Sequence, residues 1–360
     1  MKTFMSIQIL QPHIPHYREE FFKKLSERVS TKVYCYNSDT EIATSDFEKG
    51  NFITNKIDTY NFGPFVWYNP FKMIKSKSDT IVLMLDFKHI ATWFLLLTRI
   101  FHKRRIIIWG QGISIKRYLK DERKTLVILK WMLKIADGVW FYTEKEKQLW
   151  QKRIPNLNAV ALNNTISDID KILRISKRSI PDKQQLKDQY KIKQPIVMLF
   201  CARFTPDRRT DLLLEVINKV NPEKFGFIII GEGKSKPSFK NFSNVYDFGK
   251  VYDFDLKTEL FAISDIYFQP AWLGLSVVEA MGYGKPVFTF KRSEKVLQCV
   301  EYFYVKDGDN GKIFEDPNEM LDYLKNIDCN EINLMGEYSK NYVMENLTMN
   351  DMVNNAIMIL

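Results

Sequence analysis

Residues 268–286, with the sequence FQPAWLGLSVVEAMGYGKP, decide how the second half of this chain is organised. A short apolar strand ends at Phe268, a turn follows at Pro270, and an apolar-periodic helix carrying Glu279 stops at the glycines around Tyr283. A strand, a glycine-containing turn and a helix start together present backbone N–H groups and the positive end of a helix dipole to an anion. A carboxylate one turn into the helix can accept hydrogen bonds from a ribose. The segment therefore predicts half of a nucleoside-diphosphate site, and an ordinary strand–helix unit is the alternative.

Short apolar segments of strand type alternate with helical patterns along the whole chain. The runs IVMLFC at 196–201 and FIII at 227–230 are continuously apolar, as strands covered on both faces are. This alternation indicates parallel sheets with crossover helices, and it occurs twice. In the first half we expect strands at residues 5–10, 32–36, 80–85, 105–109, 138–142 and 159–162. In the second half we expect strands at residues 196–201, 226–230, 244–247, 265–268 and 286–288.

The length of 360 residues suits two domains rather than one core. The stretch from about 165 to 190 is polar and charged, and it is expected to join the domains. We therefore predict an α/β protein of two doubly wound, Rossmann-like domains facing a cleft, with domains at 1–170 and 171–335. A C-terminal helix at 336–360 is expected to cross back over the first domain.

The excess of positive charge lies in the first half of the chain. Residues 1–170 hold 27 lysines and arginines against 17 acidic residues, whereas residues 171–360 hold 26 of each. The basic cluster Lys103–Arg105 is the best single candidate for binding an anionic surface, either a membrane or a nucleic acid. A solvated basic face with buried tryptophans is the alternative. The tryptophans and the phenylalanine near the basic clusters are Trp93, Phe94, Trp131 and Trp150.

Cysteine and histidine usage argues against a metal or a disulfide framework. The four cysteines are scattered without CxxC spacing, which favours free thiols in a reducing compartment. Only four histidines occur, and no His/Cys cluster offers a metal site. The N-terminus has no signal-peptide pattern and the longest apolar run is too short to span a bilayer, so we expect a protein inside the cell.

Polar and glycine residues follow four successive strands of the second predicted sheet. Arg203 and Arg208 follow the strand at 196–201, and two such guanidinium groups could hold a diphosphate and neutralise its charge as it leaves. Gly231 and Gly233 follow the next strand, where glycine lets backbone approach a ligand closely. The fourth strand is followed by the helix that carries Glu279, the last residue of this group. Residues of this kind on one sheet edge make a binding site the favoured interpretation, and the third strand contributes Gly249, Lys250 and Val251.

The second domain resembles the donor-binding half of retaining, GT-B-fold glycosyltransferases of glycosyltransferase family 4. The resemblance spans about residues 196–325, and the first domain resembles the family more loosely through QPHIPHYREEFFKKL and IIIWGQG. The segments that carry it, in the family's order and spacing, are FCARFTPDRRTDLLLEVI, FIIIGEGKSK, NVYDFGKV, AISDIYFQPAWLGLSVVEAMGYGKPVFTF and DNGKIFEDPNEMLDYL.

The resemblance implies roles for individual residues. Arg203 and Arg208 match the two phosphate-binding cations, and Glu279 matches the ribose-binding glutamate. The loop that meets the diphosphate and the sugar is matched by Gly274, Leu275 and Ser276. These roles make Arg203, Arg208 and Glu279 the catalytic set, and the donor-binding set is Gly231, Gly233, Lys250, Val251, Ala271, Gly274, Leu275 and Ser276.

Three positions depart from the family pattern. Ala271 stands where the first glutamate of the E-x(7)-E signature is expected, so the sugar cannot be inferred from the family. Arg209 replaces the glycine that usually follows the second cation. Gln111 replaces a frequent histidine in the first domain; it still donates a hydrogen bond but cannot titrate.

The acceptor side is expected on the first domain. His13 and His16 follow the first strand beside Tyr17 and Arg18, and a capped loop histidine is the alternative reading of either imidazole. Together with Gln111 these residues form the predicted acceptor-side set.

The sequence thus predicts a glycosyltransferase that uses a nucleotide-sugar donor with retention and without metal or other cofactor. The acceptor is expected to be a saccharide or a lipid-linked saccharide at an anionic inner-membrane surface, in a surface-polysaccharide pathway and with no nucleic-acid partner. The expected location is cytoplasmic and peripheral to the inner face of the cell membrane. A GT-B-fold nucleotide-sugar epimerase and a non-catalytic carbohydrate-binding relative remain as alternatives.

Overall fold

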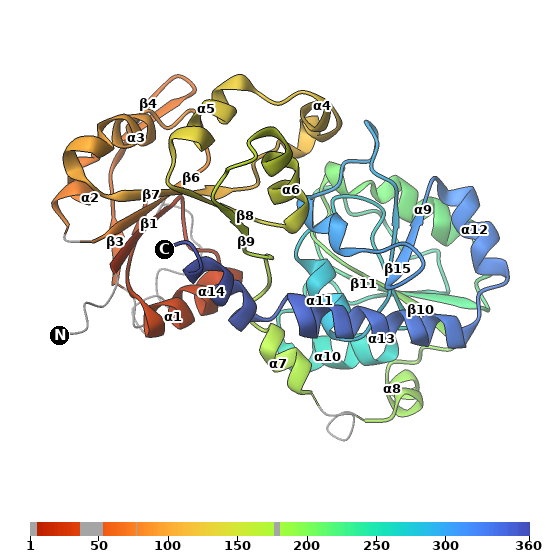
Figure 1. The fold of residues 1–360 in the computed structure, drawn as a ribbon. Coiled ribbons are helices and arrows are strands. Elements are labelled where there is room, and N and C mark those ends of the chain that lie inside the picture. The colour runs from red at the N-terminus through yellow and green to blue at the C-terminus, as the bar shows by residue number, and fades with distance from the viewer. Residues whose placement is uncertain (1–5, 37–52, 77, 176–180) are drawn as a thin grey trace. The chain divides into compact units, whose positions relative to one another are not determined.

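The computed structural model describes residues 6–36, 53–76, 78–175 and 181–360, with the backbone alone for residues 53–55. Two compact units emerge (Figure 1): unit 1 is Met1–Ser167 with Met349–Leu360, and unit 2 is Asp168–Thr348. Met5, expected to open the first strand, lies outside the described residues, as do residues 176–180 of the expected linker.

Unit 1 is built on a seven-stranded sheet in which all paired strands are parallel. Each strand expected in the first half is present within two residues. The strands in sheet order are β3 (Ile53–Lys56), β2 (Ser30–Cys35), β1 (Ser6–Gln11), β6 (Thr80–Met84), β7 (Arg105–Gly110), β8 (Gly138–Phe141) and β9 (Ala159–Ala161).

Three strands of unit 1 were not predicted. They are β3 and an antiparallel hairpin, β4 (Thr59–Phe62) and β5 (Phe65–Tyr68), which turns at Gly63 with φ +56°. Glycine suits such a turn because it has no Cβ to clash at positive φ. Aromatic residues flanking Gly63 were the available signal for this hairpin.

Helices cover both faces of the unit 1 sheet (Figure 1). Leu95 of α3 and Met132 of α5 pack with Ile81 and Ile108 in one core cluster. On the other face, Phe21 of α1 contacts the rings of Trp109 and Trp140. The helices of this unit are α1 (Glu19–Arg28), α2 (Phe71–Lys75), α3 (Ile90–His102), α4 (Tyr118–Arg123), α5 (Val127–Ile135), α6 (Glu144–Arg153) and α14 (Met349–Ile357), with 3-10 turns at His16–Arg18 and Ile115–Arg117.

Unit 2 is built on a six-stranded parallel sheet. The two apolar runs that predicted buried strands are β10 and β11, and both are almost entirely buried. The last strand, β15, was not predicted. The strands in sheet order are β12 (Val245–Asp247), β11 (Phe225–Ile230), β10 (Ile196–Cys201), β13 (Ile266–Phe268), β14 (Val287–Phe290) and β15 (Gly311–Phe314).

The helices of unit 2 connect these parallel strands. They are α7 (Ile169–Arg174), α8 (Lys183–Gln189), α9 (Thr210–Lys219), α10 (Phe254–Ile263), α11 (Ser276–Gly282), α12 (Pro317–Lys325) and α13 (Cys329–Asn346), with 3-10 turns at Pro206–Arg208 and Val300–Tyr304.

Both sheets reverse their strand order at one point. In unit 2 the chain builds outward from β10 through β11 to β12, then returns to add β13 on the other side of β10. In unit 1 the same reversal falls between β1 and β6. This is the doubly wound Rossmann arrangement, in which ligands bind where the strand order reverses, beyond the carboxyl ends of the strands. The predicted α/β, Rossmann-like fold is confirmed for each unit.

The C-terminal segment returns to unit 1, as expected, but it is not one helix. The chain breaks at Leu347 between α13, which belongs to unit 2, and α14, which belongs to unit 1. The guanidinium group of Arg28 on α1 donates to Asn354 on α14 at 2.5 Å. Met352, Val353 and Ala356 of α14 are buried. These contacts fix the returning helix on the first unit.

None of the helices in the described parts of the chain combines the length and the apolar character needed to cross a bilayer.

Candidate functional site

The residues predicted to bind the donor gather at the switch point of unit 2. Arg203 and Arg208 follow β10, and residues 269–275 follow β13, which pairs with β10 in parallel register. Both segments therefore leave the same edge of the sheet at the point where the strand order reverses. This is the position at which doubly wound sheets bind ligands.

The two predicted phosphate-binding arginines have different environments. Arg203 is exposed, whereas Arg208 is half-buried and donates through Nη1 to the carbonyl of Trp272 at 2.5 Å. Burial lowers the pKa of Arg208, but an arginine remains charged at any physiological pH. One cation is thus exposed to solvent, and the other is tied to the loop after β13.

Gln269, which is fully buried, holds the loop after β13 from within. Its Nε2 donates to the carbonyls of Ala271 (2.9 Å) and Trp272 (2.8 Å). Its Oε1 accepts from the hydroxyls of Tyr267 (2.7 Å) and Ser276 (3.2 Å). A single amide side chain therefore ties the strand, the loop and the first residue of α11 together.

Gln298, also fully buried, holds the same loop from the other side. It accepts from the N–H of Leu273 at 2.9 Å and donates to the carbonyl of Phe290 at 2.8 Å. Between these contacts Trp272 has a left-handed backbone, φ +55°, with its N–H donating to Leu297. Such a conformation costs a non-glycine residue roughly 1–3 kcal/mol, so the loop is held in place by its surroundings. Neither glutamine was predicted as a site residue.

Gly274 faces open space at the end of this loop. A Cβ built on Gly274 meets no heavy atom within 4 Å. Leu275 and Ser276 follow directly and begin α11, whose first turn has no side-chain cap. Uncapped N–H groups at a helix start need an acceptor from solvent or from a ligand. The three residues are arranged as an anion-binding turn would require.

Glu279 has a partner that the sequence did not predict. Lys257 on α10 places its Nζ 2.9 Å from Oε1 of Glu279, and both side chains are largely buried. Burial alone would lower the pKa of Lys257, but the Glu279 carboxylate, together with Cys201 and Asp168, raises the pKa above its usual value. The second carboxylate oxygen of Glu279 is left to accept from another donor. No spacing rule links positions 257 and 279, because the contact joins two helices.

Gly231 and Gly233 have a packing role that the sequence did not predict. They have φ +138° and +155°, and a Cβ at either position would lie 2.0–2.1 Å from the carbonyl oxygens of Ala202 and Phe204. The backbone that approaches these glycines in this structure is the segment after β10. They support the segment that carries Arg203. On the neighbouring loop Lys250 is exposed, and Val251 is buried.

Ala271 does not line an open surface. Its side chain is completely buried, so the prediction that position 271 borders the sugar is wrong for this structure. The turn at Pro270 carries Ala271 inward before the chain emerges at Gly274. A carboxylate at position 271 would need either burial at a high energetic cost or a rearranged loop.

The backbone conformation of Arg209 accounts for the glycine that the resembling family has at this position. It has φ +52°, a left-handed conformation that favours glycine, the residue usual at this place in the resembling family. Its guanidinium group forks onto Asp211, with contacts of 2.6–3.1 Å, and donates to the carbonyl of Lys295 at 2.8 Å. These bonds direct the guanidinium group of Arg209 toward Asp211 and Lys295 and not toward Arg203.

Unit 1 brings its predicted acceptor-side residues to one sheet edge. His13, His16 and Tyr17 follow β1 and Gln111 follows β7, with β6 between these strands. Both histidines are exposed, and Tyr17 and Gln111 are half-buried. These four side chains follow the carboxyl ends of near-neighbour strands.

Arg18 is not an open acceptor-side residue. It is only 6% exposed, and its guanidinium carbon lies 4.4 Å from the ring centroid of Trp109 and 5.0 Å from that of Tyr142. Stacking of this kind fixes a guanidinium group between aromatic faces. We therefore assign Arg18 a structural role across β1, β7 and β8.

His89 at the unit 1 switch point was missed. It follows β6, is buried, and its Nε2 lies 3.4 Å from the hydroxyl of Tyr36. Burial lowers the pKa of His89 and keeps its imidazole neutral, with the Asp86 carboxylate acting in the opposite direction. The available signal was the DFKH sequence directly after a predicted strand.

Among the described residues, no group of three or more His, Cys, Asp and Glu side chains could hold a metal ion.

Two Rossmann-like units, with the C-terminal helix returning to the first, define the GT-B fold. Residues 182–328, most of unit 2, match the family described as glycosyl transferases group 1.

Two curated bacterial proteins resemble part of the chain. An uncharacterised glycosyltransferase of Haemophilus influenzae is 26% identical over 205 residues, 54% of this chain and 51% of that protein. An uncharacterised 41.2 kDa protein in the cps region of Klebsiella pneumoniae is 30% identical over 173 residues, 46% of each chain. The matched segment thus spans about half the length of these relatives.

A solved structure resembles the whole chain. Anabaena HepE in complex with UDP and glucose superimposes with a TM-score of 0.67 at 14% identity, covering 98% of both chains. At this identity the likeness establishes the shared fold.

Proposed function

We propose that the protein is a glycosyltransferase that moves a sugar from a nucleoside-diphosphate sugar to a saccharide acceptor, with retention and without a metal ion. The observation that carries this proposal is the assembly at the unit 2 switch point. Arg203, Arg208 and the open turn at Gly274 leave adjacent parallel strands there, within the segment that matches glycosyl transferases group 1. The complex of HepE with UDP and glucose, a protein of the same fold, supports a nucleotide-sugar donor.

In the proposed reaction the bond from the sugar's anomeric carbon to the diphosphate breaks, and a bond to an acceptor oxygen forms on the same face. The nucleoside diphosphate leaves with increased negative charge, and the proton of the acceptor hydroxyl passes to an oxygen of the leaving diphosphate or to water. Arg203 and Arg208 would stabilise that charge in place of a metal ion, aided by the N–H groups of Leu275 and Ser276. Glu279 would accept hydrogen bonds from the ribose through the carboxylate oxygen that Lys257 does not engage.

We assign the acceptor to unit 1, where His13, His16, Tyr17 and Gln111 follow the strands of one sheet edge. The excess positive charge of residues 1–170 supports an acceptor presented at an anionic surface, a saccharide linked to lipid. We place the protein on the inner face of the cell membrane, in surface-polysaccharide synthesis. Fold alone does not define an acceptor, so this part of the proposal rests on charge.

Incubation with a panel of UDP-, GDP-, ADP-, TDP- and CDP-sugars tests the reaction. At least one donor should release its nucleoside diphosphate faster in the presence of bacterial lipid-linked saccharides, and chelator should not slow the release. NMR of the product should show the anomeric configuration of the donor. An inverted product contradicts retention, an epimerised nucleotide sugar identifies an epimerase, and no turnover of any donor favours a non-catalytic relative.

A further inference from the structure

Unit 1 exposes several large apolar side chains on two helices that pack against each other. Phe101 and Ile100 of α3 are 80% and 70% exposed, and Trp131 of α5 is 64% exposed. We name this surface the α3–α5 face; its members are Leu97, Ile100 and Phe101 on α3 and Val127, Ile128 and Trp131 on α5. Leaving so many large apolar groups together in water is costly and marks an interaction surface.

The opposite sides of both helices are firmly attached to the unit 1 sheet. Leu95 and Leu96 of α3, and Met132 and Leu133 of α5, are buried in the core. The exposed residues therefore cannot turn inward by rotation of either helix. They are a second apolar surface, outside the core.

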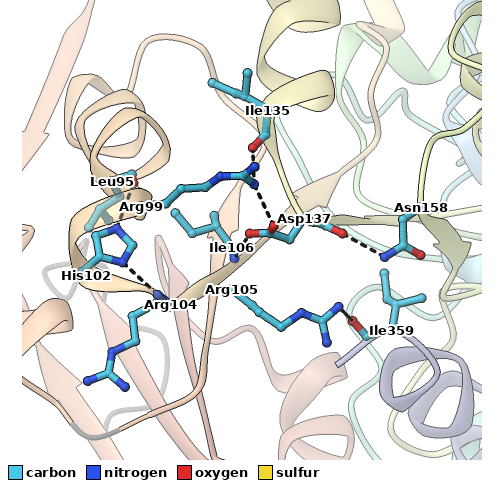
Figure 2. A network of polar contacts seen from close by, with 10 residues as sticks. All are labelled: Leu95, Arg99, His102, Arg104, Arg105, Ile106, Ile135, Asp137, Asn158 and Ile359. Carbon is cyan, nitrogen blue, oxygen red and sulfur yellow. Dashed lines mark hydrogen bonds and ion pairs between the residues drawn. The ribbon is translucent and has the colours of Figure 1, made fainter.

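Arg99 fixes the two helices relative to each other. From α3 it donates to the carbonyl of Ile135 at the end of α5 (2.8 Å) and pairs with Asp137 (2.7 Å), as Figure 2 shows. Asp137 in turn accepts from the N–H of Ile106 on β7. The α3–α5 face is thus preformed, and docking on it requires no folding step.

Two of the three cations in the cluster Lys103–Arg105 beside this face make hydrogen bonds within unit 1. Arg105 donates to the carbonyl of Ile359, as Figure 2 shows, and to that of Leu360. Arg104 donates to the carbonyl of Ser76. Most of the predicted cluster Lys103–Arg105 is therefore used within unit 1, and only Lys103 remains of it. Trp150, one of the tryptophans near the basic clusters, is fully buried and donates to the carbonyl of Gly112, which agrees with the alternative of buried tryptophans.

Other lysines surround the face. The ammonium groups of Lys103, Lys130 and Lys134 have no hydrogen-bond or ion-pair partner in the part of the chain that the structure describes. Between positions 88 and 135 the sequence has twelve lysines and arginines against two acidic residues, Asp121 and Glu122. An apolar centre with a cationic surround complements an anionic lipid surface, which offers acyl chains below phosphate groups.

We propose that the α3–α5 face docks the protein on an anionic lipid bilayer, with Ile100, Phe101 and Trp131 inserted at the level of the headgroups. The helices are too short to span the membrane, so they lie in its interface. The proposal specifies the membrane contact of the proposed function. Its test needs no sugar donor, so failure of docking and failure of glycosyl transfer can be told apart.

The experiment compares full-length variants in sedimentation with vesicles of equal parts phosphatidylglycerol and phosphatidylcholine, and with pure phosphatidylcholine. The test variant combines I100S, F101S and W131S. The matched control combines L334S, Y338S and M344S, which replace residues of α13 that are 50%, 50% and 53% exposed. Wild type and control should bind the anionic vesicles, and the test variant should lose about a hundredfold or more in affinity.

Two further arms separate insertion from simple charge attraction. Salt should weaken binding of the wild type without abolishing it, because the apolar contact is not screened. Lys130→Glu with Lys134→Glu should remove the preference for anionic over neutral vesicles. Lipids brominated near the headgroup should quench the fluorescence of the wild type but not that of a W131F variant at the same depth.

Several outcomes would overturn docking. Equal vesicle affinity of the wild type and the I100S/F101S/W131S variant would do so, as would release of all wild-type protein by salt. If the wild type ignores vesicles but forms dimers that the triple variant cannot form in sedimentation velocity, the face joins two copies of the chain. A cooperative thermal unfolding transition near that of the wild type confirms that the triple variant is folded.

Discussion

The ammonium group of Lys257 on α10 lies 2.9 Å from a carboxylate oxygen of Glu279 on α11, in a largely buried position. Glu279 is the residue expected to bind the donor's ribose, so Lys257 determines which of its oxygens is free. The pair also joins two helices that flank the switch point of unit 2. Lys257 is therefore a positioning residue for the proposed donor site.

We expect Lys257→Met to weaken nucleoside-diphosphate binding by about tenfold, because Glu279 loses the contact that orients it and a largely buried carboxylate loses its partner. Glu279→Gln should have a similar effect, and the double variant should cost little more than either single variant. Calorimetric titration of the four proteins measures this coupling. Additive losses would mean that the two residues act independently; Lys219→Ala, which breaks the exposed pair with Glu215, is the control.

Substitution of Arg203 and substitution of Arg208 should differ in their effect on the stability of the protein. Arg203 is exposed, so Arg203→Ala should lower turnover by on the order of a hundredfold while the urea midpoint stays unchanged. Arg208→Ala should lower turnover similarly and also destabilise the protein, because the carbonyl of Trp272 loses one of its two donors and keeps that of Gln269. Turnover assays with parallel urea titrations check both. Wild-type turnover in either variant would remove that arginine from the site.

Gly274→Ala tests whether the open space beside the turn belongs to the donor. An added methyl group meets nothing within 4 Å, so the melting temperature should stay within experimental error of the wild type. A diphosphate seated against the turn would clash with that methyl group, and the KM for the donor should rise by about tenfold. An unchanged KM would place the diphosphate elsewhere on unit 2.

Arg209 should show the cost of its left-handed backbone. Arg209→Gly removes the strain, which is roughly 1–2 kcal/mol, whereas Arg209→Ala keeps it, and both variants lose the fork onto Asp211. The glycine variant should therefore be more stable than the alanine variant by about 1 kcal/mol in urea unfolding. The reverse order would show that the left-handed backbone at position 209 carries no such cost.

The strand content was largely predictable because buried parallel strands leave apolar runs in the sequence. The run at 196–201 predicted β10 with both ends correct. The β4–β5 hairpin was missed because its pairing is antiparallel and mostly exposed, so its aromatic residues do not form a buried run. The returning C-terminal segment was predicted as one helix because the sequence around Leu347 remains apolar-periodic across the break.

The site residues that directly follow strands could be predicted from the sequence. Those that reach the site from other parts of the fold could not. Arg203 and Gly274 leave neighbouring strands, and strand order alone brings them to one edge. Gln298 and Lys257 reach the same site through tertiary packing, for which sequence spacing carries no signal. Ala271 was misplaced because a sequence pattern gives a residue's position in a turn but not the direction in which its side chain points.

Calorimetric titration with UDP, GDP, ADP, TDP and CDP tests the central claim that the switch point of unit 2 holds a nucleoside diphosphate. The wild type should bind at least one of them without added metal, and Arg203→Ala should weaken that binding by about tenfold or more, with Lys219→Ala unchanged. If no nucleoside diphosphate binds the wild type, or if Arg203→Ala binds it as tightly, the donor site is not at the carboxyl ends of β10 and β13.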